Sequence, residues 1–350
     1  MSLYLNRVLK ALNTPHPLQP IWQTFLSNIQ AEALSFSIEK KLLSSLLKFE
    51  CAANLAKKYS LHPQNTDYLL QLLASMDLLE TYTNEINQIT FYRVKEILKP
   101  YFDLKNPQYC ADSLLFRHQI MQSVCKQLPD TLSSDFEIQS KSIESIELGW
   151  ANAARTQIAQ EQSAITIHIA ELLSHLIDEF KSAQYFLDVG AGAGLISMHL
   201  AENFPQLECT LLEFPDVIDA IRPTLKKHPV HARINCLPAN IQTINFEKQY
   251  DIIWCSSVLH FVDDYSSILE KLLNALSPNG ILICCHSEID SVQPNPLIHS
   301  YYLNMRMQGN YVPQKGDIYR ALKQLGCEHI QLIENVQFPV APLDVLIVRK

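Results

Sequence analysis

Three of the chain's eight glycines, Gly190, Gly192 and Gly194, fall within five residues of an otherwise glycine-poor sequence. The cluster follows the apolar run Tyr185–Val189 and precedes a helix-like run from Leu195 to Glu202. Glycine lacks a Cβ and adopts positive φ without strain, so this pattern is typical of a strand-to-helix turn that a ligand approaches closely. The sequence therefore predicts a nucleotide-type site in an α/β domain.

The spacing of the glycines indicates which nucleotide the site would take. Dinucleotide folds use G-x-G-x-x-G, whereas this chain has G-x-G-x-G with Asp188 two residues before the first glycine. A carboxylate there would repel a pyrophosphate and would accept a hydrogen bond from an amino group. The pattern favours S-adenosylmethionine over NAD as the cofactor.

A second acid, Glu213, ends the next predicted strand, 23 residues after Gly190. Open α/β folds place an acid at this position, where it accepts hydrogen bonds from ribose hydroxyls. Both S-adenosylmethionine and NAD carry a ribose diol, so Glu213 does not separate them. The simpler alternative is an exposed carboxylate at a strand end.

Composition limits the possible partners. The chain has 350 residues, of which 47% are hydrophobic and 18% charged, which is enough for two domains with separate cores. Its net charge of −8 and the absence of any run of three Lys or Arg argue against nucleic acid, so the expected partner is a small molecule. No apolar stretch is as long as a membrane span and no signal peptide is evident, which predicts a cytoplasmic protein without membrane contact. The nine cysteines never form C-x-x-C and predict neither disulfides nor a zinc finger.

The two parts of the chain differ in their patterns. Residues 1–145 show helical periodicity and are predicted to form a mainly α domain. Within it, 52–59 and 66–79 read as a helix–turn–helix, and 80–92 reads as a hairpin, a combination that resembles a winged helix. The would-be recognition helix, 65–80, has three acids and no Lys or Arg, which is hostile to a phosphate backbone. We therefore expect this domain to form a homodimer with a second copy of the chain.

Residues 146–350 are predicted to form a doubly wound α/β domain, in which 146–180 are connecting helices that cover the substrate. The helices between the strands are expected at 217–226, 266–276 and 316–325. The link between the last two strands is too short for a helix, so they should form an antiparallel hairpin. This fold class is a Rossmann-like sheet of seven strands with an antiparallel last strand, and its strands are predicted at 186–189, 209–212, 233–237, 251–256, 281–285, 329–333 and 344–348.

Four blocks of the sequence resemble the small-molecule O-methyltransferases typified by caffeate and acetylserotonin methyltransferases, which are dimers with an N-terminal winged-helix domain. The glycine block resembles the family's cofactor loop, and LEFPDVI at 212–218 resembles its D-L-P-x-V block with Glu213 in place of aspartate. LPANI at 237–241 lies where the family has G-D-x-F, and VLHFVDD at 258–264 lies where it has L-H-D-W-x-D. The resemblance extends over nearly the whole chain.

The resemblance implies a role for particular residues. His260 would be the general base that deprotonates the acceptor hydroxyl. The implied cofactor-binding residues are Asp188, Gly190, Gly192 and Gly194 for the methionine end, Glu213 for the ribose, Asn240 and Ile241 for the adenine, and also Phe214 and Ser256. The implied substrate-binding residues are Trp150, Ile158, Gln162, His286 and Met305, which suggest a flat, aromatic acceptor.

Departures from the family pattern leave other chemistries open. Phe261 replaces the aspartate after the histidine, and the acids expected later in the family fall at His286 and near Asn310 or Tyr311. Without these carboxylates the pKa of His260 should fall, unless Glu288 compensates. One alternative is C-methylation of a 2-oxo acid, assisted by a metal on His260 and His286 with Glu288 or His299, or another reaction of the same cofactor. Another is a non-enzymatic winged-helix regulator that binds a ligand.

Overall fold

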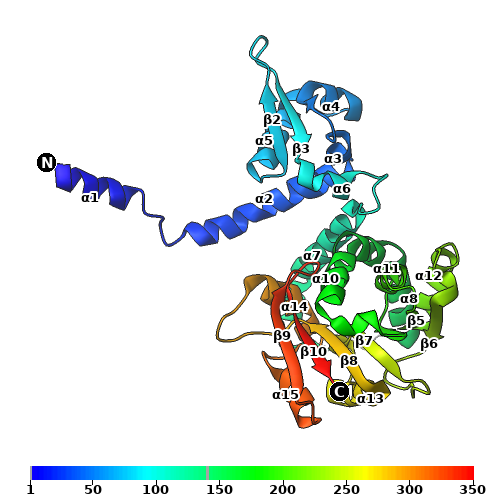
Figure 1. Cartoon of the computed structure of the whole chain (residues 1–350). Helices are drawn as coiled ribbons and strands as arrows, with labels where there is room; N and C mark the ends of the chain where they lie inside the picture. The colour runs from blue at the N-terminus through cyan, green and yellow to red at the C-terminus, as the bar shows by residue number, and fades with distance from the viewer. Residues whose placement is uncertain (1, 139–141) are drawn as a thin grey trace. The chain divides into compact units, whose positions relative to one another are not determined.

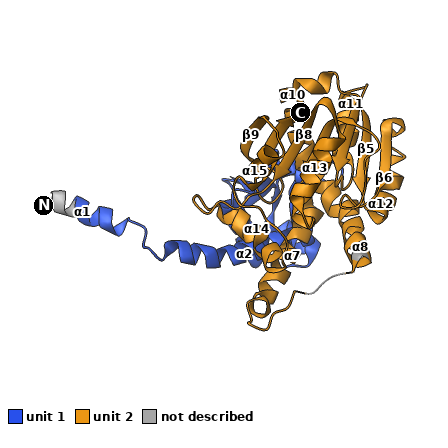
Figure 2. Cartoon of the chain, turned by 90° about the horizontal axis from the view of Figure 1, so that it is seen from below, with its two compact units in different colours: residues 1–106 blue, residues 107–350 orange. Residues whose placement is uncertain are grey.

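The computed structural model describes residues 2–138 and 142–350, apart from the side chains of residues 2–5 and 143. The chain divides into two compact units, one ending at Asn106 and the other beginning at Pro107 (Figures 1 and 2). Among the described residues, no helix is long and apolar enough to cross a membrane.

The first unit is mainly helical with one small sheet. Its core consists of fully buried leucines, among them Leu42, Leu46, Leu70 and Leu73, which the helical periodicity had indicated. The three strands pair antiparallel in the order β1-β3-β2. The elements are α1 (Ser2–Leu12), α2 (Gln19–Glu39), α3 (Leu42–Ser45), β1 (Glu50–Cys51), α4 (Ala52–Tyr59), α5 (Pro63–Ser75), β2 (Leu79–Thr83), β3 (Thr90–Val94), η1 (Glu96–Leu98) and α6 (Lys99–Phe102).

The predicted order of helix, turn, helix and hairpin is present, but the second helix is shorter than expected. α5 ends at Ser75, and Leu79 already begins β2. The cause is a left-handed residue, Asp77, with φ of 65°. Its N–H donates to the carbonyl of Ala74, and the next N–H donates to the carbonyl of Leu73. This Schellman geometry usually has glycine at the left-handed position, so an aspartate there gave no stop signal in the sequence.

The second unit is built on a seven-stranded sheet in the order β6-β5-β4-β7-β8-β10-β9 (Figure 1). The first five strands in this order run parallel, and β10 lies antiparallel between β8 and β9. This confirms the predicted seven-strand sheet with an antiparallel last strand. The strands are β4 (Tyr185–Val189), β5 (Glu208–Glu213), β6 (Ile234–Pro238), β7 (Tyr250–Ser256), β8 (Leu276–His286), β9 (His329–Val336) and β10 (Leu343–Arg349).

Helices pack on both faces of this sheet, as expected for strands that are apolar on both sides. One face packs against residues of α8 (Ile143–Ala153), α10 (Ile167–Leu176), α11 (Leu195–Asn203) and α12 (Pro215–Leu225). The other face packs against α13 (Tyr265–Ala275) and α15 (Asp317–Gln324). The predicted helices therefore lie within one or two residues of those observed.

The long helical segment before the sheet contains two π-helical stretches, η2 (Ala154–Ile158) and η3 (Gln162–Thr166), joined by α9 (Ala159–Glu161). α7 (Ala111–Thr131) is tied to this segment, since Ser113 donates to the side chains of Gln160 and Glu161. These bonds lie within the second unit, which begins at Pro107, whereas the sequence analysis placed a domain boundary at residue 145.

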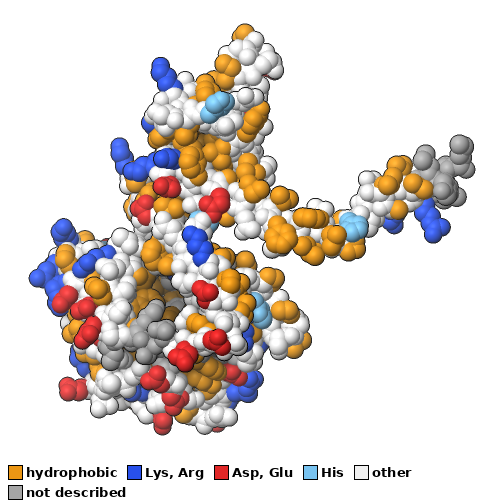
Figure 3. Space-filling view, turned by 180° about the vertical axis from the view of Figure 1, so that it is seen from behind, with side chains coloured by type: hydrophobic (Ala, Val, Ile, Leu, Met, Phe, Trp, Pro, Cys, Tyr) orange, Lys and Arg blue, Asp and Glu red, His pale blue; other side chains and the backbone are white. Residues whose placement is uncertain are grey.

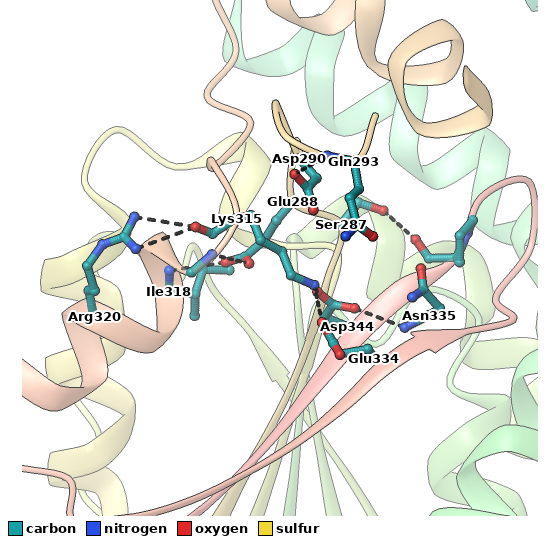
Figure 4. Close-up of polar contacts among 12 residues, drawn as sticks. Ser287, Glu288, Asp290, Gln293, Lys315, Ile318, Arg320, Glu334, Asn335 and Asp344 are labelled. Carbon is teal, nitrogen blue, oxygen red and sulfur yellow. Dashed lines mark hydrogen bonds and ion pairs between the residues drawn. The ribbon is translucent and has the colours of Figure 1, made fainter. Parts of the chain in front are cut away.

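After β8 the chain leaves the sheet, forms α14 (Pro296–Met307) and returns at Gln314. Glu288 links the two ends of this segment. Its carboxylate accepts the N–H groups of Gly316 at 2.6 Å and Ile318 at 3.2 Å (Figure 4). Lys315 beside it pairs with Asp344 at 2.5 Å and with Glu334 at 2.8 Å. Glu288 therefore caps α15 and does not approach His260, so the expectation that it compensates for the missing carboxylates is wrong.

We predict that Glu288→Ala lowers the stability of the second unit by about 2–4 kcal/mol, because two buried N–H groups lose a charged acceptor. The midpoint of urea unfolding, followed by tryptophan fluorescence, measures this change. Glu334→Ala is the matched control: its side chain is 55% exposed, so it should cost less than about 1 kcal/mol. Equal losses for the two variants would contradict the assigned role of Glu288.

Candidate active site

A cavity of about 290 Å³ opens at the carboxyl ends of the parallel strands, where doubly wound folds bind ligands. Its size lies near the lower limit for small-molecule sites, which suits the predicted small-molecule partner. Thirteen of the fifteen residues that the sequence assigned to a site line it: Trp150, Ile158, Gln162, Asp188, Gly190, Gly192, Glu213, Phe214, Asn240, Ile241, Ser256, His260 and Met305. The other two, Gly194 and His286, do not.

The glycine loop has the conformation that its sequence predicted. Gly190, Gly192 and Gly194 have φ of 66°, 59° and 73°. A Cβ at Gly190 would lie 2.5 Å from the side chain of Val258, and one at Gly192 would lie 2.7 Å from that of Ile158. Gly194 is the N-cap of α11 rather than a cavity residue. Both φ and close packing therefore require glycine at this turn.

Gln162 supports the glycine loop from the helical side. Its Nε2 donates to the carbonyl of Ala191 at 3.0 Å, and its Oε1 accepts the N–H of Leu195 at 3.2 Å. The sequence assigned Gln162 to the substrate, but both ends of its amide already hold the backbone of the loop. Its main effect is to fix the cofactor turn against η3.

Asp188 is buried at the end of β4, with an exposed fraction of 1%. Ser197 Oγ donates to it at 2.7 Å. Burial raises the pKa of Asp188 to about 7; the bond from Ser197 opposes this rise, and the nearby Glu213 carboxyl adds to it. A cationic group in the cavity would therefore interact strongly with this carboxylate.

Glu213 joins the glycine loop to β5. Its carboxylate accepts the N–H of Gly192 at 3.0 Å and its neighbour Phe214's N–H at 2.9 Å. Burial raises the pKa of Glu213 to about 7, while the two backbone hydrogen bonds lower it. Each oxygen keeps a lone pair for a ligand hydroxyl.

Asn240 and Ile241 follow β6 and line the same cavity. The Asn240 Oδ1 accepts the N–H of Gln242 at 2.9 Å, and the carbonyl of Ile241 accepts from Lys271 Nζ at 2.9 Å. The amide oxygen that was expected to accept from an adenine amine therefore already has one backbone donor, which leaves it a single further lone pair.

His260 lies in the 3₁₀ turn η6 (Leu259–Phe261) after β7 and is 2% exposed. Its Nδ1 lies 3.2 Å from the carbonyl oxygen of Tyr311, so Nδ1 carries the proton. Its Nε2 is buried without a hydrogen-bond partner. Burial lowers the pKa of His260 to about 4, although the Tyr311 carbonyl opposes this shift. The low pKa agrees in direction with the sequence expectation, but its main cause is burial.

His286 is a correction to the sequence analysis, which placed it against the substrate. It is 1% exposed, and its Nε2 accepts the N–H groups of Val258 at 3.1 Å and Leu259 at 3.0 Å. Burial, followed by the nearby His260, lowers the pKa of His286 well below its usual value. A neutral His286 thus holds the turn that carries His260.

In this structure, side chains that the metal-assisted alternative needs as ligands already form hydrogen bonds with the backbone. The Nε2 of His286 and both oxygens of Glu288 are engaged by backbone N–H groups. Among the described residues, no group of three or more His, Cys, Asp or Glu side chains is arranged to hold a metal ion.

The sequence analysis missed a charged pair in the cavity wall. Arg117 of α7 forms two parallel bonds with Glu161, at 2.7 and 2.8 Å, and donates to the hydroxyl of Tyr301 at 2.9 Å. Burial acts to lower the pKa of Arg117, but the bonds with Glu161 and Tyr301 raise it overall. Gln157, from the π-helical stretch η2, and Glu161, at the end of α9, also line the cavity. The sequence did not single out Glu161, because it lies between Gln160 and Gln162 in a helical run with many polar residues.

Comparison with known proteins supports this description. Residues 187–282 match a family described as a methyltransferase domain, which confirms the predicted methyltransferase domain in this part of the chain. An uncharacterised protein of Methanocaldococcus jannaschii is 23% identical over 252 residues, covering 71% of this chain and 64% of that protein. Malonyl-[acyl-carrier protein] O-methyltransferase 1 of Ilyobacter polytropus is 25% identical over 114 residues, covering 32% and 41% of the two chains.

The fold is also that of solved methyltransferases. Human N-acetylserotonin methyltransferase, crystallised with S-adenosylmethionine, superposes with a TM-score of 0.76 at 16% identity, covering 97% of this chain and 99% of the other. This likeness confirms the predicted fold class. The chain matches less than two thirds of the length of the curated relatives named above.

We predict that binding of a ligand with an ammonium group, such as S-adenosylmethionine, releases protons near pH 7. The cation favours the ionised forms of Asp188 and Glu213, whose pKa values are about 7 without it. Affinity should therefore fall as pH drops below 7, by up to about tenfold per pH unit for each linked carboxyl. Calorimetric titrations in two buffers with different ionisation enthalpies would measure the protons released. Binding without proton release between pH 6 and 7 would contradict this linkage.

Proposed function

We propose that this protein is an S-adenosylmethionine-dependent methyltransferase that methylates a hydroxyl group on a small aromatic molecule, with His260 as general base. The observation that carries the proposal is that one cavity holds both a cofactor-type turn and the unpaired Nε2 of His260. S-adenosylmethionine, when bound, supplies a methyl group already activated on a sulfonium.

The cofactor end of the cavity suits a cationic ligand. Asp188 would accept from the amino group of the methionine part, and Glu213 from the ribose hydroxyls. The glycine loop lets the ligand approach the backbone because no Cβ stands there. Phe214, Asn240 and Ile241 would line the adenine end, and Ser256, at the end of β7, also lines the cavity.

The acceptor end explains why the hydroxyl should be aromatic. With a pKa of about 4, His260 is neutral at physiological pH and can accept a proton at Nε2, but it is a weak base. A phenol, with a pKa of about 10 as in tyrosine, gives up its proton far more readily than an alcohol. The cavity wall at this end includes Trp150, Phe261, Tyr302 and Met305, which suit the faces of a ring.

Replacing His260 by Ala should lower turnover at least ~100-fold if it is the base, with cofactor affinity nearly unchanged. Turnover is measured by transfer of labelled methyl to a phenol panel, and affinity by calorimetry. A His260→Ala enzyme with wild-type turnover would remove the assigned base.

The pH profile gives a second readout of the same role. At saturating cofactor, kcat/KM for the acceptor should stay level from pH 8 to about 5 and fall only as His260 becomes protonated near pH 4. An acid limb near the ordinary histidine value of about 6.5 would contradict a buried, carbonyl-bonded base.

We also propose that the chain forms a homodimer through its first unit. One side of α2 exposes apolar residues at helical spacing, and hydrophobic side chains are seen along this helix in Figure 3. The residues are Ile21, Trp22, Phe25, Leu26 and Ile29. Each is at least half exposed within a single chain. Such a surface is typical of an interface rather than of a solvated helix.

Light scattering after size exclusion would test the dimer. The wild-type chain should have twice the mass of one chain, and the variant with Trp22, Phe25 and Ile29 all changed to Glu should be a monomer. The control places three glutamates on another side of α2, at Gln23, Ser27 and Gln30, and should remain dimeric. A monomeric wild type would overturn the proposal.

A further inference from the structure

Among the described residues that line the cavity, two have a buried ring nitrogen without a hydrogen-bond partner: His260, at Nε2, the atom proposed as the base, and Trp254, at Nε1. Trp254 is 1% exposed and lies on β7, directly beside Asp188 of β4 in the strand register. A buried indole N–H that is not hydrogen-bonded is costly in a folded protein. Because Trp254 lines the cavity, a bound molecule is a candidate partner for this N–H.

The two nitrogens are complementary in what they require. An indole N–H can only donate. His260 holds its proton on Nδ1 toward the Tyr311 carbonyl, so its Nε2 can only accept. A molecule that satisfies both must offer one donor and one acceptor. A hydroxyl that faces His260 supplies the donor, and an oxygen elsewhere on the molecule must supply the acceptor.

The charges around the cavity limit the kind of oxygen. Arg117 is the cation among the lining residues that the structure describes, and its charge is compensated by two bonds to Glu161. Asp188 and Glu213 add further acidic groups to the same wall. A carboxylate on the acceptor would find no uncompensated positive side chain among the described lining residues, so a neutral oxygen such as a ketone is favoured.

We propose that Trp254 is a specificity-determining residue whose indole N–H binds a neutral carbonyl oxygen of the acceptor. The acceptor class is thus an uncharged aromatic compound that carries both a hydroxyl and a carbonyl group. This inference rests on the proposed methyltransferase function, because it assumes that the hydroxyl is the group facing His260.

The test compares matched acceptors that differ in this oxygen. Ortho-, meta- and para-hydroxyacetophenone, the corresponding ethylphenols and the corresponding hydroxybenzoates are titrated calorimetrically into the full-length protein saturated with S-adenosylhomocysteine. At least one hydroxyacetophenone should bind about ten- to a hundred-fold more tightly than its ethylphenol, and the hydroxybenzoates should bind more weakly than the ketones. Trp254→Phe should reduce the ketone preference to about threefold or less.

Two controls keep the outcomes distinct. Trp254→Phe must bind S-adenosylhomocysteine like the wild type and show a similar unfolding midpoint, which separates a lost hydrogen bond from a misfolded variant. A tenfold loss of S-adenosylhomocysteine affinity would show that the N–H serves the cofactor and would overturn the proposal. So would the absence of a ketone preference in the wild type, or its survival in Trp254→Phe. Failure of the wild type to bind S-adenosylhomocysteine at all would instead remove the proposed function itself.

Discussion

The geometry of the site depends on the glycine loop, which is held by hydrogen bonds from two elements, one on each side of it. Glu213, from β5, accepts the N–H of Gly192, while Gln162, from η3, bonds the loop at Ala191 and Leu195. Because the loop has no side chain larger than alanine between Gly190 and Gly194, its shape is set by these contacts and by close packing against Val258 and Ile158. The same burial that fixes the loop also raises the pKa of the neighbouring carboxyls, so the rigidity of the turn and its affinity for a cation have one physical origin.

On the proposed acceptor side of the cavity, different interactions hold the key residue. His260 is held by a backbone carbonyl and by the packing of His286 beneath its turn, with no carboxylate bonded to its ring. A carbonyl fixes the tautomer and the orientation of the ring, but it stabilises an imidazolium less than a charged partner would. In the proposed reaction, His260 would therefore act as a well-oriented but weak base. A weak base suits an acidic hydroxyl, which links the missing carboxylates to the aromatic character of the proposed acceptor.

Much of the fold could be predicted because the signals were local. The buried parallel strands are continuous apolar runs, and the short link before Asp344 allowed only a hairpin. The predictions were wrong where the sequence carried no local signal, or where the outcome depended on the direction in which a side chain points. Asp77 ended a helix without glycine, and two π-helical stretches interrupt the helix that carries Gln157 and Glu161, which a plain helical pattern does not predict. His286 and Glu288 lie at the strand end where they were expected, yet their side chains bond backbone N–H groups instead of facing the acceptor.

The sequence by itself determined the seven-strand architecture, the cofactor turn with its two acids and the position of His260, because each depends on residue type and on spacing along one strand or turn. Only the tertiary structure decided which polar atoms are already paired. The side chains of Gln162, His286 and Glu288 bond backbone groups, and Arg117 pairs with Glu161, 44 residues away in sequence. Trp254 Nε1 and His260 Nε2, in two residues that line the cavity, have no hydrogen-bond partner. Hydrogen bonding of buried groups is settled by neighbours that are distant in sequence, so no local pattern can reveal which groups remain for a ligand.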